Sequence, residues 1–261
     1  AVAYRLAEAG HSVVVIEFGG TDAGPFIQMP GALSYPMNMK RYDWGLQSER
    51  EPHLGGRELA TPRGKVIGGS SSVNGMVYVR GHARDYDHWA EQGADGWSYR
   101  DVLPHFRAVE TYAGDPSQFR GAHGPLQISD LRNDNPACND WLRAARAHGL
   151  PQNSDFNGES SYGVGGYQLT LRGRWRDCAA TAFLHPALLR PNLTLQTAAQ
   201  VIEITFQGQR ASGVRYIQNG GLCEAEASTE VILCGGSVQS PQLLQLSGIG
   251  PADLLAANGI R

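Results

Sequence analysis

The sequence has 261 residues, of which 41% are hydrophobic, 18% charged and 8% aromatic, a composition typical of an ordinary globular protein. A chain of this length buries a sizeable core without disulfides or metals, and it fits one large α/β domain or two smaller ones. The net charge of -3 excludes the strongly basic surface that nucleic-acid binding requires, and no apolar run approaches the ~20 residues of a membrane span.

The first predicted unit is a helix followed by a short buried strand. Residues 1–10 carry a helical apolar pattern that Gly10 ends, and residues 11–17 form a Val-rich strand that closes with Glu17. This order is typical of the second half of a dinucleotide-binding βαβ unit, whose phosphate-binding glycines stand about 20 residues before the acid. We therefore expect the first strand and those glycines to be lost upstream of Ala1. The alternative is an α/β unit with an unrelated surface glutamate.

The middle of the chain alternates helical patterns with irregular stretches. Glycine and proline breakers predict a loop over residues 19–36, and the polar, glycine-rich residues 153–167 predict an irregular crossing. Two helices carry start signals: Asp101 opens one that tolerates Pro104 near its start, and Asp177 is the N-cap of another. The expected helices lie within residues 85–112, 139–148 and 177–189.

Strand patterns return after residue 190. The expected strands are residues 193–197, 201–206, 213–218 and 230–234. The second and third form a hairpin through Gly208 and Gln209. The fourth is buried and leads through two glycines into a helix with Ser240 as its N-cap and Pro241 as its first residue. Strands and helices thus alternate at both ends of the chain, which predicts a nucleotide-binding domain built from separated segments around an inserted middle portion.

Glycine is in excess, with 33 of 261 residues, or about 13% against a typical ~7%. The densest stretch is GKVIGGSSSVNG, residues 64–75, which is not a Walker A loop because Val66 follows the Gly-Lys pair. Its paired glycines permit a sharp turn with bare amides, which can donate to an anionic or ring-nitrogen acceptor. The alternative is a Gly-Ser turn before a strand.

A second motif lies at residues 234–250, where a strand, two glycines and a helix follow one another. This order places backbone at the carboxyl edge of a sheet, where open α/β folds hold ligands. An ordinary βα connection shares the pattern and is the alternative.

These two motifs carry a family resemblance. Residues 63–87, RGKVIGGSSSVNGMVYVRGHARDYD, resemble the first signature of the glucose-methanol-choline (GMC) flavoprotein oxidoreductases, and residues 236–250, GSVQSPQLLQLSGIG, are similar to the second. The resemblance extends over essentially the whole chain. It implies an α/β fold in which residues 1–82 and 183–261 form a Rossmann-like FAD-binding domain. Residues 83–182 are implied to be an inserted α+β substrate or cap portion, with the protein truncated at both ends.

The resemblance also implies a cofactor and the residues that bind it. FAD is expected to be noncovalent, because Val73 stands where some family members carry a histidine that tethers the flavin. The ribose hydroxyls are assigned to Glu17, and the adenine to the backbone of Val201. The other implied cofactor-binding residues are Phe18, Val66, Ser70, Asn74, Gly75, Met76, Val77, Gly235 and Gly236.

The implied reaction is oxidation of a primary alcohol to an aldehyde by hydride transfer to flavin N5, with oxygen or a quinone as electron acceptor. The segments resemble those of bacterial aliphatic alcohol dehydrogenases and choline dehydrogenases, and the aliphatic group is favoured. The family's catalytic histidine is expected outside this chain, so no residue here is assigned as catalytic and the chain alone is expected to be inactive. The alternatives are a choline dehydrogenase, an FAD-containing lyase of the same family, and a non-catalytic FAD-binding remnant.

The remaining predictions concern the location of the protein, its cysteines and one basic segment. We expect a cytoplasmic protein, held peripherally at the inner membrane face if a quinone is the acceptor. The four cysteines stand far apart, which predicts reduced thiols, and no metal site is expected. The net charge favours a solvated basic turn over a nucleic-acid patch for Arg172, Arg174 and Arg176, with Trp175 between them.

Overall fold

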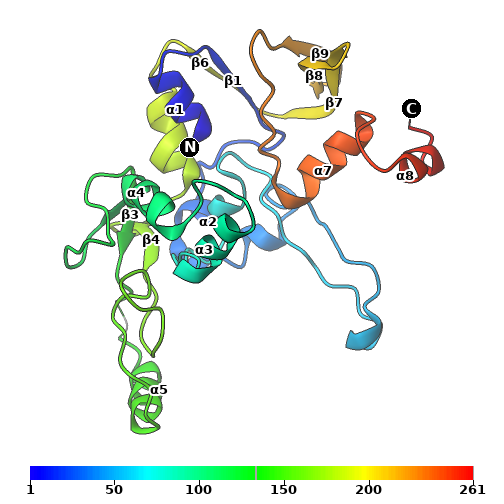
Figure 1. Ribbon diagram of the computed structural model, residues 1–261. Coiled ribbons are helices and arrows are strands. Elements are labelled where there is room, and N and C mark those ends of the chain that lie inside the picture. The colour runs from blue at the N-terminus through cyan, green and yellow to red at the C-terminus, as the bar shows by residue number, and fades with distance from the viewer. Residues whose placement is uncertain (133, 261) are drawn as a thin grey trace.

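Two segments far apart in the sequence meet in a small parallel sheet. In the computed structural model, which describes residues 1–132 and 134–260, β1 (Val13–Ile16) pairs with β6 (Leu193–Gln196). Helix α1 (Val2–Glu8) packs against this pair through a buried cluster that contains Ala7 and Leu193 (Figure 1). The predicted helix and strand at the start of the chain are confirmed, and the fold is mixed α/β.

A second, four-stranded sheet lies within the middle of the chain. Its order is β2-β3-β4-β5, with β2 parallel to β3 and the other pairs antiparallel. The strands are Glu110–Tyr112, Leu126–Ser129, Leu169–Arg172 and Trp175–Arg176. Helices α3 (Ala83–Glu91) and α4 (Tyr99–Val109) precede it, and α4 runs directly into β2. The first sheet therefore joins the two predicted cofactor-binding segments, and the second lies in the predicted insertion, although the domain boundaries remain a prediction.

A third sheet is an antiparallel meander near the carboxyl end. Strand β7 (Ala199–Gln207) turns through Gly208 into β8 (Arg210–Gln218), and β9 (Gly221–Glu226) follows. The predicted hairpin is confirmed. Helices α7 (Gly236–Leu246) and α8 (Ala252–Ala257) come next.

Three predicted features in the second half of the chain are wrong. Residues 230–234 form no strand, and Ile232 is 46% exposed, because no described strand pairs with this segment. Helix α7 begins at Gly236, so Ser240 is not its N-cap and Pro241 lies inside it. Asp177 is not an N-cap either, because its carboxylate accepts the amide of a β3 residue instead, and a π-helical turn begins only at Ala180 before α6 (His185–Ala187).

Two further predictions, a helix start and a loop, also differ from the structure. Helix α4 begins at Tyr99, because the hydroxyl of Ser98 accepts the amide of Asp101, and Pro104 therefore lies inside the helix. The predicted loop over residues 19–36 contains short helical turns, which are α2 (Pro25–Gln28) and a 3-10 turn at Pro30–Ala32.

Two arms project from the body in Figure 1. Residues 43–64 form a hairpin-like arm, with isolated pairings of Gln47 with Ala60 and of Glu51 with Arg57. The other arm carries α5 (Pro136–Ala147), which confirms the predicted helix there. The predicted irregular crossing at residues 153–167 is confirmed, since it contains no helix or strand.

Candidate functional site

The glycine-serine loop, residues 64–77, is seated on the carboxyl end of β1. Gly20 pairs with Val66 in a parallel bridge. The backbones approach so closely that a Cβ on Gly19 would lie 2.2 Å from the carbonyl carbon of Lys65. Real Cβ atoms do not approach backbone that closely, so only glycine fits there. The bridge joins the segment after β1 to the glycine-serine loop, which lies about fifty positions later in the sequence. Both regions were predicted to bind the same cofactor.

Glu17 stands at the end of β1 with unused hydrogen-bonding capacity. Its Oε1 accepts the amide of Gly19 at 2.7 Å, and no described residue donates to Oε2. Burial raises the pKa of Glu17 above its ordinary value, and the hydrogen bond from Gly19 opposes that shift. The Glu17 carbonyl accepts the amide of Ala199 at 3.0 Å, which brings the start of β7, and Val201 within it, to the same edge.

The loop exposes two backbone amides beside a strained residue. After a 3-10 turn at Gly69–Ser72, the backbone reaches Met76, a non-glycine residue with a φ of 64°. The Met76 amide donates to Oδ1 of Asn74 at 3.0 Å. The amides of Gly75 and Val77, on either side, donate to no described residue, and both residues are exposed. Such adjacent unpaired amides can donate to an anionic or carbonyl acceptor.

Several predicted site residues offer only their backbone. Val66 is fully buried and Met76 is 4% exposed, so neither side chain is available to a ligand. Phe18 packs against Trp44 with ring centroids 5.1 Å apart, and the Lys65 ammonium of the loop lies 5.6 Å from the Phe18 ring centroid. The hydroxyl of Ser70 accepts an amide of the loop itself.

Gly235 and Gly236 lie at the start of α7. A Cβ on Gly235 would meet Gln239 and Ser240 of its own helix, and a Cβ on Gly236 would meet nothing within 4 Å. That Gly235 and Gly236 approach the cofactor remains a prediction.

A buried arginine that the sequence reasoning missed lies behind the loop. Arg176 is 2% exposed. Its Nε donates to the carbonyl of Ile27 at 2.9 Å, and Nη1 donates to the carbonyl of Asn74 at 2.7 Å and to its Oδ1 at 3.0 Å. Nη2 is buried and has no hydrogen-bond partner among the described residues. Burial lowers the pKa of Arg176, and the nearby thiol of Cys178 opposes that shift.

The prediction of a solvated basic turn is therefore wrong for Arg176. Arg172, Arg174 and Trp175 are exposed as expected, but Arg176 follows Trp175 in the short strand β5 and faces the interior. Alternation along a strand was the signal that could have found it, because adjacent side chains point to opposite faces.

Two of the histidines in the described ranges have partners that indicate structural roles. The His82 ring accepts the amide of Arg84 and caps α3. The His185 ring lies 3.1 Å from both carboxylate oxygens of Asp22, a buried residue in the loop after β1. That no catalytic histidine lies in this chain remains a prediction.

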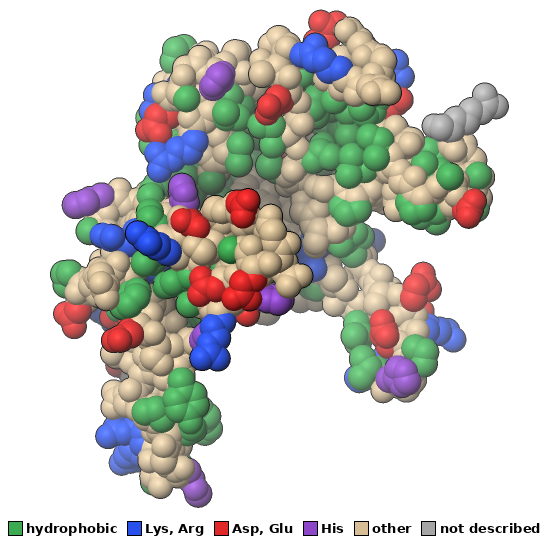
Figure 2. Space-filling view, viewed as in Figure 1, with side chains coloured by type: hydrophobic (Ala, Val, Ile, Leu, Met, Phe, Trp, Pro, Cys, Tyr) green, Lys and Arg blue, Asp and Glu red, His purple; other side chains and the backbone are tan. Residues whose placement is uncertain are grey.

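Other surfaces are less suited to a ligand. All four cysteines are free, and no group of side chains in residues 1–132 or 134–260 could hold a metal ion. Within the same ranges no helix is long and apolar enough to cross a membrane. On the face in Figure 2, basic side chains are scattered and acidic ones gather over α3.

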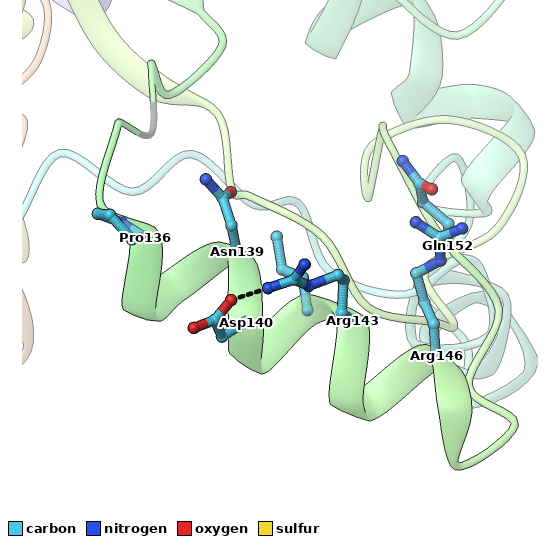
Figure 3. Close-up of a pocket in the computed structure, with 7 residues that line it drawn as sticks. Pro136, Asn139, Asp140, Arg143, Arg146 and Gln152 are labelled. Carbon is cyan, nitrogen blue, oxygen red and sulfur yellow. Dashed lines mark hydrogen bonds and ion pairs between the residues drawn. The ribbon is translucent and has the colours of Figure 1, made fainter.

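A surface hollow lies on α5, away from the glycine-serine loop. It has a volume of about 490 Å³, and Asn139, Arg146 and Gln152 line it together with an ion pair between Asp140 and Arg143 (Figure 3). Asp140 and Arg143 are both well exposed, so the hollow is an open surface groove on the projecting arm.

Comparison with known proteins identifies relatives across the whole chain. A family model described as GMC oxidoreductase matches residues 6–258. Oxygen-dependent choline dehydrogenase of Brucella anthropi is 51% identical over 261 residues, which are all of this chain and 47% of that protein. The enzyme of the same name from Sinorhizobium fredii is 49% identical over 262 residues and is also covered to 47%. The chain spans about half the length of these curated relatives.

Solved structures share the fold. Pyridoxine 4-oxidase from Mesorbium loti superposes with a TM-score of 0.94 at 32% identity, over 99% of this chain and 51% of that one. An FAD-dependent oxidoreductase from Chaetomium thermophilum gives a TM-score of 0.91 at 34% identity, over 100% of this chain and 47% of that one.

Proposed function

The chain belongs to the GMC oxidoreductase family, whose cofactor is FAD, and from this premise we propose that it forms part of the FAD site of an alcohol-oxidising enzyme. The bridge between Gly20 and Val66 carries the proposal. It joins a carboxylate with an unused oxygen to a loop with unused amides, which are the two kinds of group that a flavin dinucleotide needs at its two ends.

The described residues fit the cofactor. Oε2 of Glu17 is open to accept a ribose hydroxyl, with the start of β7 and Val201 next to it for the adenine. The amides of Gly75 and Val77 are open to donate to acceptors on the flavin ring. When bound, FAD supplies the acceptor for the hydride that leaves the alcohol carbon. These residues bind and orient the cofactor, and noncovalent attachment stays a prediction that rests on Val73.

We propose a primary alcohol as substrate, oxidised to the aldehyde, with choline as the first alcohol to test. Identities of 49–51% over the whole chain to oxygen-dependent choline dehydrogenases support choline. The aliphatic alcohols that the sequence favoured are the comparison substrates. Oxygen is proposed as electron acceptor for the same reason, with a quinone as the alternative, and the cytoplasmic location stays a prediction.

The test uses the full-length protein purified with FAD. It is mixed without oxygen with choline or with an aliphatic primary alcohol, and the visible absorbance of the flavin is followed. We expect choline to bleach the flavin and oxygen to restore it. Bleaching by the aliphatic alcohol alone would move the proposal to that substrate class, and restoration by a quinone alone would change the acceptor. If the protein holds FAD but neither alcohol bleaches it, the result favours a lyase or a non-catalytic FAD-binding protein. A protein that binds no FAD overturns the proposal.

A further inference from the structure

The side chain of Arg176 connects the glycine-serine loop to α2 through hydrogen bonds. Its guanidinium joins the carbonyl of Ile27 after β1 to the carbonyls of Ser71 and Asn74 in the loop, with donor–acceptor distances of 2.9, 3.4 and 2.7 Å. Bonds from two nitrogens of one side chain to two separate segments suit the planar fork of arginine. One of them holds Asn74, whose side chain in turn receives the amide of Met76. The guanidinium therefore fixes the stretch that exposes the two unpaired amides.

The charge of Arg176 is not cancelled. The neighbouring acid, Asp177, is committed elsewhere, because it accepts from Arg172 at 3.0 Å, from the amide of Gln127 at 2.8 Å and from the hydroxyl of Thr181 at 2.6 Å. All acceptors of Arg176 are neutral carbonyl or amide oxygens. An arginine stays protonated at neutral pH even when burial disfavours its charge. Burying a cation without a counter-ion costs folding free energy. Such unfavourable groups are concentrated at functional sites.

We infer that Arg176 is a positioning residue of the cofactor site, which fixes the glycine-serine loop through Asn74 and supplies uncompensated positive charge at Asn74, next to the amide of Gly75. This inference rests on the proposed FAD site and goes beyond it, because it assigns Arg176 two separable effects. The fork sets the shape of the loop and hence the affinity for FAD. The charge favours the reduced over the oxidised cofactor, since reduction adds negative charge to the ring.

The two effects separate in two variants of the full-length protein. Arg176→Met removes both the fork and the charge, whereas Arg176→Lys keeps a charge but cannot form the planar set of bonds. We expect Arg176→Met to raise the Kd for FAD about tenfold or more, as expected for lost hydrogen bonds from a charged group, and to shift the flavin midpoint potential to a more negative value. Arg176→Lys is expected to weaken FAD binding but to keep a potential near that of the wild type.

Arg174→Met is the matched control, because Arg174 lies in the same hairpin and is exposed. It is expected to leave both the FAD affinity and the potential unchanged. If Arg176→Met does not fold, Arg176→Lys still tests the inference through its affinity and potential. The inference is overturned if the wild type binds FAD and the Arg176 variants have the same FAD affinity and the same flavin midpoint potential. This holds even if the variants unfold at a lower temperature. A wild type that binds no FAD instead removes the proposed function on which the inference rests.

Discussion

The carboxylate of Glu17 accepts the amide of Gly19 at 2.7 Å through Oε1, while its Oε2 receives no hydrogen bond from a described residue. Burial raises the pKa of this group, so the folded chain tolerates the ionised carboxylate poorly. An under-satisfied carboxylate at the end of a βα unit's strand destabilises the chain alone and becomes satisfied when a hydroxyl binds it. Removing the charge of Glu17 should therefore stabilise the chain without cofactor but weaken the binding of FAD.

Glu17→Gln tests both. The pKa of Glu17 is higher in the folded than in the unfolded chain, so its contribution to stability is fully present below its ordinary value of 4.5 and is lost as pH rises through the folded pKa. At neutral pH the glutamine variant without cofactor is therefore expected to unfold at higher denaturant concentration than the wild type. Its Kd for FAD is expected to rise about tenfold or more, because a charge-assisted hydrogen bond is lost.

The measurements are urea unfolding at several pH values and FAD titration. Glu49→Gln is the control, because Glu49 is exposed on the projecting arm and is expected to change neither quantity. A variant that loses stability at neutral pH would show that Glu17 holds the fold rather than a ligand. An unchanged Kd for FAD would remove the assigned ribose contact.

Gly64 tests the close packing of the loop. A Cβ there would lie 2.3 Å from the carbonyl oxygen of Gly69, so Gly64→Ala must push the 3-10 turn outward. We expect a loss of about 1–3 kcal/mol in the free energy of unfolding, as for other overpacked sites, together with weaker FAD binding. The measurement is thermal unfolding with and without FAD. Gly31→Ala is the control, because a Cβ on Gly31 meets nothing within 4 Å. Equal unfolding of the two variants would contradict the packing argument.

Elements that depend on local interactions were predicted from the sequence, whereas most of those that depend on contacts between distant segments were not. Helix α1, strand β1 and the hairpin of β7 and β8 are encoded by apolar periodicity and local turn residues, and all were predicted. The second sheet was not predicted: all four of its strands, β2 to β5, were missed, as was β9. Residues 230–234 were predicted as a strand, although no described strand pairs with them.

The residues of the candidate site show the same contrast between features that were predicted and features that were missed. The glycine-serine loop and Glu17 were found from motifs, because glycine density and a terminal acid are visible along the chain. That Val66 and Met76 turn their side chains into the core could not be read from the motif. The burial of Arg176 was missed because net charge describes the whole surface and says nothing about one side chain.

Glu110 is the centre of a buried ionic cluster that links Arg80, which precedes α3, to the second sheet. It is fully buried and accepts from Arg80 at 2.8 Å and from Arg120 at 2.8 Å, and Arg120 also pairs with Asp155 at 2.6 Å. Glu110→Gln leaves two buried guanidinium groups short of negative charge. We expect a loss of about 3–5 kcal/mol in the free energy of unfolding, as for other broken buried ion pairs.

Glu8→Gln is the matched control for that prediction. Glu8 pairs with Arg5 at 2.7 Å on the surface of α1, where solvent screens the pair. We expect no measurable change in urea unfolding for this variant. If Glu110→Gln unfolds with the same midpoint as Glu8→Gln, the buried cluster does not stabilise the fold.

Tyr112 gives the chain a dependence on alkaline pH. Its hydroxyl donates to Oδ1 of Asp130 at 2.8 Å, and the Arg120 guanidinium lies 3.6 Å from its ring centroid. Burial, and then Asp130, raise the pKa of Tyr112 to about 12 from an ordinary 10.0. Because the folded pKa is the higher one, the contribution of this phenol to stability is fully present below pH 10 and is lost as pH rises through about 12.

Tyr112→Phe is therefore expected to be less stable than the wild type by a constant amount below pH 10, and the difference should narrow above it. Urea unfolding across this range, with absorbance titration of the tyrosinates, measures both effects. Tyr162→Phe is the control, because Tyr162 is 67% exposed and its hydroxyl contacts no described residue. Asp130→Asn removes the acceptor's charge and is expected to lower the pKa of Tyr112 toward its ordinary value, since an anionic neighbour disfavours the phenolate. If the stability gap between Tyr112→Phe and the wild type stays constant through alkaline pH, the Asp130 hydrogen bond is not what holds the phenol proton.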